Sequence, residues 1–186
     1  MCGSGMKATM IVNDQLVAGS NKVSIAGGIE SMSNTPYVLP KVRSGLRMGH
    51  GELKDHMFLD GLEDAYEPGR LMGSYAEATA QAYQFSRQAQ DEFAIRSLER
   101  AKKANEDGSF EDELVPVVVK NHKGSFTVSR DEQPFTADIS KIPNLKPAFS
   151  KNGTVTAANS SSISDGAAAL VIMCKEEAEK RRFEKK

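Results

Sequence analysis

The spacing of apolar residues changes twice within the first thirty positions of the chain. Residues 3–18 place apolar side chains on nearly every face of a helix, a pattern typical of a buried helix. Gly19-Ser20-Asn21 predicts its end. Residues 22–28 then have the pattern of a short strand that ends in the pair Gly27-Gly28, which favours close packing or a tight exit from the strand. A helix followed by a strand predicts an α/β layer fold.

A long stretch with little periodicity follows, over residues 30–86, and it is rich in Met, Pro, Gly and Tyr. A loop of this length within a compact domain usually has a function. Two helices are expected around its end, one over about residues 73–84 and one over about residues 87–105. Ser86 is the expected N-cap of the second, because its hydroxyl can accept a hydrogen bond from the first turn. We interpret this second helix as structural.

The next part of the chain predicts a β-hairpin, with strands over residues 114–120 and 126–129. Pro116 lacks a backbone N–H, so it confines the first strand to a sheet edge or makes Val117 its first residue. Residues 130–152 form a polar connection that contains three prolines.

The last part of the chain returns to apolar residues. A β-like start at Gly153 runs into a group of small polar side chains, and residues 166–173 are then continuously apolar. Such a run is typical of a strand that is buried on both faces. A charged helical start follows from Lys175.

Composition narrows the classes of function. Lys and Arg number 24 against 25 Asp and Glu, so the net charge of -1 gives no basic excess for nucleic acid. Cys2 and Cys174 are the only two cysteines, which speaks against a disulfide scaffold and fits a reducing compartment. No apolar run reaches membrane-spanning length, and no signal peptide is recognisable, so we expect neither a membrane protein nor a secreted one.

Cys2 is the residue with the clearest chemical potential. It precedes the predicted first helix, where unpaired backbone N–H groups and the helix dipole favour a thiolate nucleophile. The alternative is a small buried cysteine at the start of a core helix. His50, His56 and His122 lack metal-ligand spacing with a cysteine, so no metal site is expected. Sequence position does not nominate any of them as the base for Cys2.

Three segments in this order resemble the thiolase family, and within it the acetyl-CoA acetyltransferases. The opening CGSGMKA at Cys2 is similar to the thiolase segment that bears the acyl-accepting cysteine. Residues 23–33 (VSIAGGIESMS) resemble the strand and turn that follow it, and residues 153–173 (GTVTAANSSSISDGAAALVIM) resemble the central signature of the family.

The resemblance implies a role for each matching residue. Cys2 would carry the acyl group as a thioester, and its backbone N–H would help to form an oxyanion hole. Met72 would line the acyl pocket, beside Leu71, which stands where many thiolases have a histidine. Five further positions match residues that hold coenzyme A, with Ser161 contacting the pantetheine arm: Leu145, Ala148, Phe149, Ala157 and Ser161. Coenzyme A thioesters would thus be substrates, acetyl-CoA or acetoacetyl-CoA, and we expect no permanently bound cofactor.

The resemblance also implies a layered αβαβα fold of the thiolase type, α/β in class. Residues 1–33 would belong to the N-terminal core, residues 34–152 to an inserted loop domain, and residues 153–186 to the core again. The Gly-His-Pro and Cys-x-Gly-Gly-Gly segments that supply acid and base in thiolases do not occur in the sequence. We therefore expect an interior fragment of a thiolase, inactive alone.

Alternatives remain open at this point. The parent enzyme could be a 3-ketoacyl-CoA thiolase for longer chains, or the chain could serve only in oligomer assembly. The resemblance implies a homo-oligomer, a tetramer in the full-length parent, in the cytoplasm or an organelle matrix.

Overall fold

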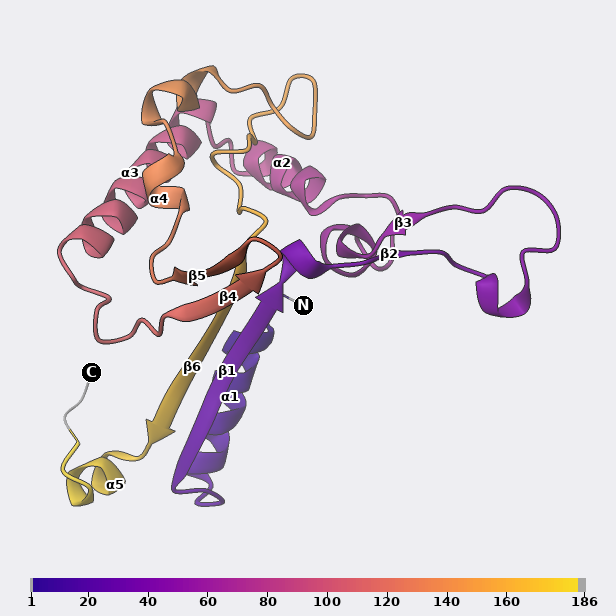
Figure 1. Ribbon diagram of the computed structural model, residues 1–186. Coiled ribbons are helices and arrows are strands. Elements are labelled where there is room, and N and C mark those ends of the chain that lie inside the picture. Colours follow the sequence, from indigo (N-terminus) through magenta and orange to yellow (C-terminus); the bar gives the residue numbers. More distant parts are fainter. Residues whose placement is uncertain (1, 184–186) are drawn as a thin grey trace. The chain divides into compact units, whose positions relative to one another are not determined.

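The computed structural model describes residues 2–183, which form two compact units (Figure 1). The first unit contains Met1–Leu71 and Ile163–Lys186, and the second contains Met72–Ser162. The three-segment division predicted from the sequence, with boundaries after residues 33 and 152, stays a prediction about the family architecture.

The first unit is built on one helix and two long strands. Helix α1 (Ser4–Val17) precedes strand β1 (Val23–Ser31), which pairs antiparallel with β6 (Asp165–Met173) so that Val23 faces Met173 and Ser31 faces Asp165 (Figure 1). The predicted opening helix and strand are thus confirmed, although the strand continues past the glycine pair. A Cβ at Gly27 would lie 2.6 Å from the carbonyl oxygen of Ala168, so the glycine permits close strand packing.

The core of the first unit lies between α1 and one face of the sheet. Val12 and Leu16 of α1 pack against Ala26 of β1, with Ile172 and Cys174 partly buried beside them. The Cys174 thiol lies 3.8 Å from the carbonyl oxygen of Leu16.

Two predictions of full burial are wrong for this chain. The helix over residues 3–18 exposes Met6, Met10 and Val17, and the strand over residues 166–173 is exposed along most of its length. The reason is that α1 covers only one face of a two-stranded sheet. No described part of this unit covers the opposite face, where Ile29 is 82% exposed.

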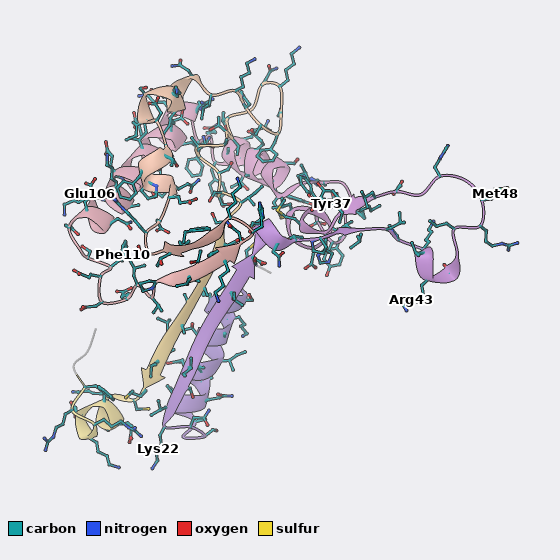
Figure 2. The ribbon with its side chains drawn as sticks, viewed as in Figure 1. Lys22, Tyr37, Arg43, Met48, Glu106 and Phe110 are labelled. Carbon is teal, nitrogen blue, oxygen red and sulfur yellow. The ribbon has the colours of Figure 1, made fainter. Side chains whose placement is uncertain are left out.

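The rest of the first unit is largely irregular, as its poor periodicity predicts. Two short strands, β2 (Tyr37–Val38) and β3 (Lys54–Asp55), pair at the base of a long excursion. Figure 2 shows Arg43 and Met48 near the tip of this excursion. Four short helical segments complete the unit, namely 3-10 helices at Met32–Asn34 and Val42–Ser44, a π-helix at Phe58–Leu62, and α5 (Lys175–Lys180).

The second unit contains the two predicted helices and the predicted hairpin. These elements are α2 (Met72–Ala82), α3 (Arg87–Glu106), β4 (Val117–Asn121), β5 (Gly124–Val128), α4 (Gln133–Thr136) and a 3-10 helix at Ile139–Asn144. The Ser86 hydroxyl caps α3 by accepting a hydrogen bond from the Ala89 N–H, as predicted. Strand β4 begins at Val117, directly after Pro116, which confirms one of the two readings of that proline.

One predicted element is absent from the second unit. The β-like start at Gly153 forms no strand, because its backbone N–H groups are bound by side chains of α2 and by Asn159 instead of by a neighbouring strand. Among residues 2–183, no helix is both long enough and apolar enough to cross a membrane.

Candidate active site

Cys2 lies at the N-terminal end of α1, as the sequence predicts. Gly3 is the N-cap residue, and its carbonyl oxygen accepts the first helical hydrogen bond from the Lys7 N–H at 2.9 Å. The Cys2 thiol is free and the residue is exposed, so the structure does not support the alternative of a buried core cysteine. The N–H groups of the first helical turn, which lack partners within the helix, lie at this end of α1.

Leu71 and Met72 lie at the boundary between the units. Leu71 is the last residue of the first segment of the first unit and forms an isolated antiparallel bridge with Glu63. Met72 is the first residue of α2 in the second unit.

The five residues predicted to hold coenzyme A all lie in one segment of the second unit, residues 145–161, which we call the 145–161 loop. The segment has neither helix nor strand. A hydrogen bond of 2.9 Å from the Ala148 N–H to the Val155 carbonyl oxygen joins two inner positions of the loop. Ala148, Phe149, Ala157 and Ser161 are exposed and Leu145 is half-buried, so the loop presents most of these residues to solvent.

The start of α2 lies against this loop within the second unit. The ring of Phe149 packs over Gly73, the residue after Met72, so closely that a Cβ at Gly73 would lie 2.3 Å from the ring. A side chain at position 73 would therefore have to displace the ring, and the contact places a predicted coenzyme A residue against the residue that follows Met72, the predicted acyl-pocket residue.

Glu77 of α2 binds the middle of the loop. Its carboxylate accepts hydrogen bonds from the backbone N–H groups of Thr154 and Val155, each at 2.9 Å, and from the Thr154 hydroxyl at 3.2 Å. Burial alone would raise the pKa of Glu77. These hydrogen bonds lower it by more, so the pKa lies below the ordinary value of 4.5. A Cβ at Gly153 would lie 2.1 Å from Glu77 Oε1, which explains the glycine before Thr154.

Asp91 of α3 binds two side chains that reach the same loop. Its carboxylate accepts from Arg87 Nε at 2.7 Å and from Asn159 Nδ2 at 3.1 Å. Asp91 is only 4% exposed, and a buried carboxylate needs such partners.

Sequence reasoning missed Glu77 and Asp91 as residues that shape the site. We interpreted α3 as purely structural, and only the i,i+4 spacing of Arg87 and Asp91 signals a pair there. Glu77 and Thr154 are 77 positions apart in the sequence, and Asp91 and Asn159 are 68 positions apart. No local sequence pattern can show contacts between residues so far apart.

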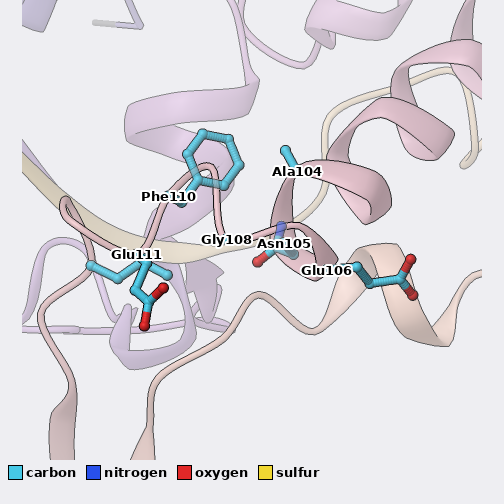
Figure 3. A pocket seen from close by; sticks show the side chains of 7 residues that line it. Ala104, Asn105, Glu106, Gly108, Phe110 and Glu111 are labelled. Atoms are coloured by element: carbon cyan, nitrogen blue, oxygen red, sulfur yellow. The ribbon is translucent and has the colours of Figure 1, made fainter.

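Two carboxylates in the irregular part of the first unit have a structural role. The carboxylates of Asp64 and Glu63 accept backbone N–H groups of the turn at Tyr66, Glu67 and Gly69. Within the part of the chain that the structure describes, no three His, Cys, Asp or Glu side chains gather to hold a metal ion. A shallow pocket of about 310 Å³ beside Phe110, at the end of α3, includes none of the predicted site residues (Figure 3).

Comparison with known proteins identifies the family. Residues 1–176 match the family described as thiolase, N-terminal domain. Acetyl-CoA acetyltransferase 2 of Arabidopsis thaliana is 49% identical over 181 residues, which are 96% of this chain and 45% of that protein. The acetyl-CoA acetyltransferase of Cupriavidus necator is 45% identical over 93% of this chain and 44% of its own length.

Solved structures agree with the sequence comparison. The acetyl-CoA acetyltransferase of Syntrophomonas wolfei matches with a TM-score of 0.85 at 43% identity, over 98% of this chain and 46% of that one. That of Bacillus anthracis matches with a TM-score of 0.88 at 40% identity and the same coverage. The chain belongs to the thiolase family, and the predicted α/β thiolase-like fold is confirmed. The chain spans less than half the length of these relatives.

Proposed function

We propose that the complete protein containing this chain is an acetyl-CoA acetyltransferase. It condenses two molecules of acetyl-CoA to acetoacetyl-CoA and CoA, or catalyses the reverse thiolysis. The observation that carries this proposal is the free, exposed Cys2 thiol at the N-terminus of α1, in a chain of the thiolase family. The names of the four relatives support acetyl-CoA as the substrate.

Cys2 is the proposed nucleophile. Its sulfur attacks the carbonyl carbon of acetyl-CoA, the new C–S bond forms, and the bond to the coenzyme A sulfur breaks. The proton lost from Cys2 leaves with coenzyme A as its thiol. A second acetyl-CoA then loses a proton from its methyl carbon, and the resulting carbanion attacks the acetyl group on Cys2. The new carbon–carbon bond displaces the Cys2 sulfur, which recovers a proton.

The remaining predicted site residues serve substrate binding in this proposal. Met72 lines the acyl pocket with Leu71 beside it in the substrate site, and the 145–161 loop holds coenzyme A through Leu145, Ala148, Phe149, Ala157 and Ser161. The mostly exposed positions of the loop residues and the contact of Phe149 with the start of α2 support this assignment. Coenzyme A enters and leaves as substrate and product.

The proton transfers need an acid and a base. In thiolases the Gly-His-Pro and Cys-x-Gly-Gly-Gly segments supply them, and this sequence contains neither segment. We therefore propose that activity requires residues of the complete protein beyond this chain. We also propose that the complete protein is a homo-oligomer, which light scattering after size exclusion tests directly.

Thiolysis of acetoacetyl-CoA by the complete protein tests the function. We expect turnover by the wild type and its loss in Cys2→Ala, with a matched Cys174→Ala variant retaining it. Faster turnover of longer 3-ketoacyl-CoA substrates would show that the complete protein is a long-chain 3-ketoacyl-CoA thiolase instead. Full activity in Cys2→Ala would exclude the mechanism, and turnover by the isolated chain would contradict the need for further residues.

A further inference from the structure

The 145–161 loop lacks the backbone hydrogen-bond ladder of a helix or strand, so its shape depends on side chains from α2 and α3. Glu77 holds only its middle, at Thr154 and Val155. A different group is needed to fix the two ends relative to each other.

Asp91 is connected to the start of the loop through Arg87. The Arg87 guanidinium donates from Nε to Asp91 Oδ2 at 2.7 Å. Its Nη2 donates to the carbonyl oxygens of Ile142 and Leu145, each at 3.0 Å. The planar guanidinium thereby transmits the position of Asp91 to the backbone of Leu145, a proposed coenzyme A residue.

Asp91 is connected to the end of the loop through Asn159. The Asn159 side-chain amide donates to Asp91 Oδ1 at 3.1 Å and to the Thr154 carbonyl oxygen at 3.0 Å. Its Oδ1 accepts the Thr156 N–H at 2.7 Å. Asn159 therefore connects Asp91 to the backbone of Thr154 and Thr156, directly before Ala157, and Thr156 is fully buried.

We propose that Asp91 is a positioning residue for coenzyme A, which acts through Arg87 and Asn159 to set the distance between the two ends of the 145–161 loop. This inference rests on the proposed function, because it takes the loop as the coenzyme A site. The negative charge of Asp91 suits this role. A carboxylate can accept hydrogen bonds from a guanidinium and an amide at the same time, and a neutral group of the same size accepts them less strongly.

The inference predicts a specific kinetic signature. Asp91, Arg87 and Asn159 belong to the second unit, whereas Cys2 belongs to the first. Disturbing the three residues therefore weakens substrate binding and leaves the nucleophile unchanged. Partial misfolding has the opposite signature, since it lowers the amount of active enzyme and hence the apparent kcat, without changing KM.

Two variants of the complete protein test it. Asn159→Asp has the same size but replaces the donating amide with a second carboxylate against Asp91. Arg87→Lys keeps the positive charge but cannot contact Asp91 and both carbonyl groups together. Asp107→Asn is the matched control, since Asp107 pairs with Lys103 at the exposed end of the same helix.

Calorimetric Kd for coenzyme A and the steady-state constants for thiolysis are measured together. We expect Asn159→Asp to raise Kd and KM about tenfold, equivalent to about 1.4 kcal/mol. Arg87→Lys should raise both several-fold, while kcat stays within about twofold and Asp107→Asn has no effect.

Each outcome decides between the claims. An active wild type whose two variants bind coenzyme A with unchanged Kd would overturn the positioning role and leave the proposed function standing. A fall in kcat at constant KM would also overturn it, in favour of a folding role. A wild type that binds coenzyme A, is weakened by both variants and has no thiolytic activity would support the positioning role and refute the function. A wild type that does not bind coenzyme A would refute both.

Discussion

The aromatic ring of Phe149 occupies the space that a side chain at Gly73 would need, with only 2.3 Å between the ring and the position of a Cβ. This contact joins the start of α2 to the 145–161 loop within the second unit. It is the point where the proposed acyl pocket and the proposed coenzyme A site meet, because Met72 precedes Gly73.

Gly73→Ala is therefore expected to displace Phe149. We predict a loss of about 1–3 kcal/mol in the free energy of unfolding, as for other overpacked sites. We also predict a several-fold rise in KM for acetoacetyl-CoA in the complete protein. Urea denaturation and steady-state kinetics measure the two effects. Gly61→Ala, where an added Cβ meets no atom within 4 Å, is the control and should change neither. An unchanged KM for acetoacetyl-CoA in Gly73→Ala would show that the position of Phe149 does not affect substrate binding.

Glu77→Gln tests the carboxylate that binds the middle of the loop. We predict a loss of about 1 kcal/mol at neutral pH, because the amide cannot replace a carboxylate that accepts two backbone N–H groups. The pKa of Glu77 is lowered in the folded state, so its contribution is present above about pH 4.5 and is lost as pH falls through the folded value.

The difference in stability between wild type and Glu77→Gln should consequently shrink with acidification, as followed by urea denaturation. Glu99→Gln, on the exposed side of α3, should match the wild type throughout. A stability difference that is constant with pH, or that grows as pH falls, would contradict the assigned role of the charge.

The open face of the β1–β6 sheet predicts association of the isolated chain. Ile25, Ile29 and Val171 lie on this face, since Ile25 pairs with Val171 and side chains alternate along a strand. Exposed apolar faces and unpaired strand edges favour self-association. We expect Val171→Lys to reduce it, in size exclusion with light scattering over a concentration series. A wild-type chain that stays monomeric at all concentrations would contradict the prediction that this exposed apolar face causes self-association.

Sequence patterns predicted local elements well where the determining residues are neighbours. The Ser86 cap and the start of β4 after Pro116 are examples, because capping and the missing proline N–H act within a few positions. The family resemblance predicted the fold for a similar reason, since it rests on three contiguous segments.

Burial and the loop scaffold could not be predicted in this way. Residues 166–173 have the composition of a buried strand, but burial depends on which partners cover the sheet, and the described residues of the first unit cover one face only. Glu77 and Asp91 look like ordinary helix-surface carboxylates in the sequence. Their roles arise only when the chain returns to them at Thr154 and Asn159.

Acetylation of Cys2 tests the central claim most directly. The complete protein is incubated with acetyl-CoA, quenched in acid and digested, and its peptides are analysed by mass spectrometry. We predict one acetyl group on the Cys2 peptide, removed by added coenzyme A, and an unmodified Cys174. Turnover of acetoacetyl-CoA with Cys2 never acetylated, or with the acetyl group on another residue, would contradict the account.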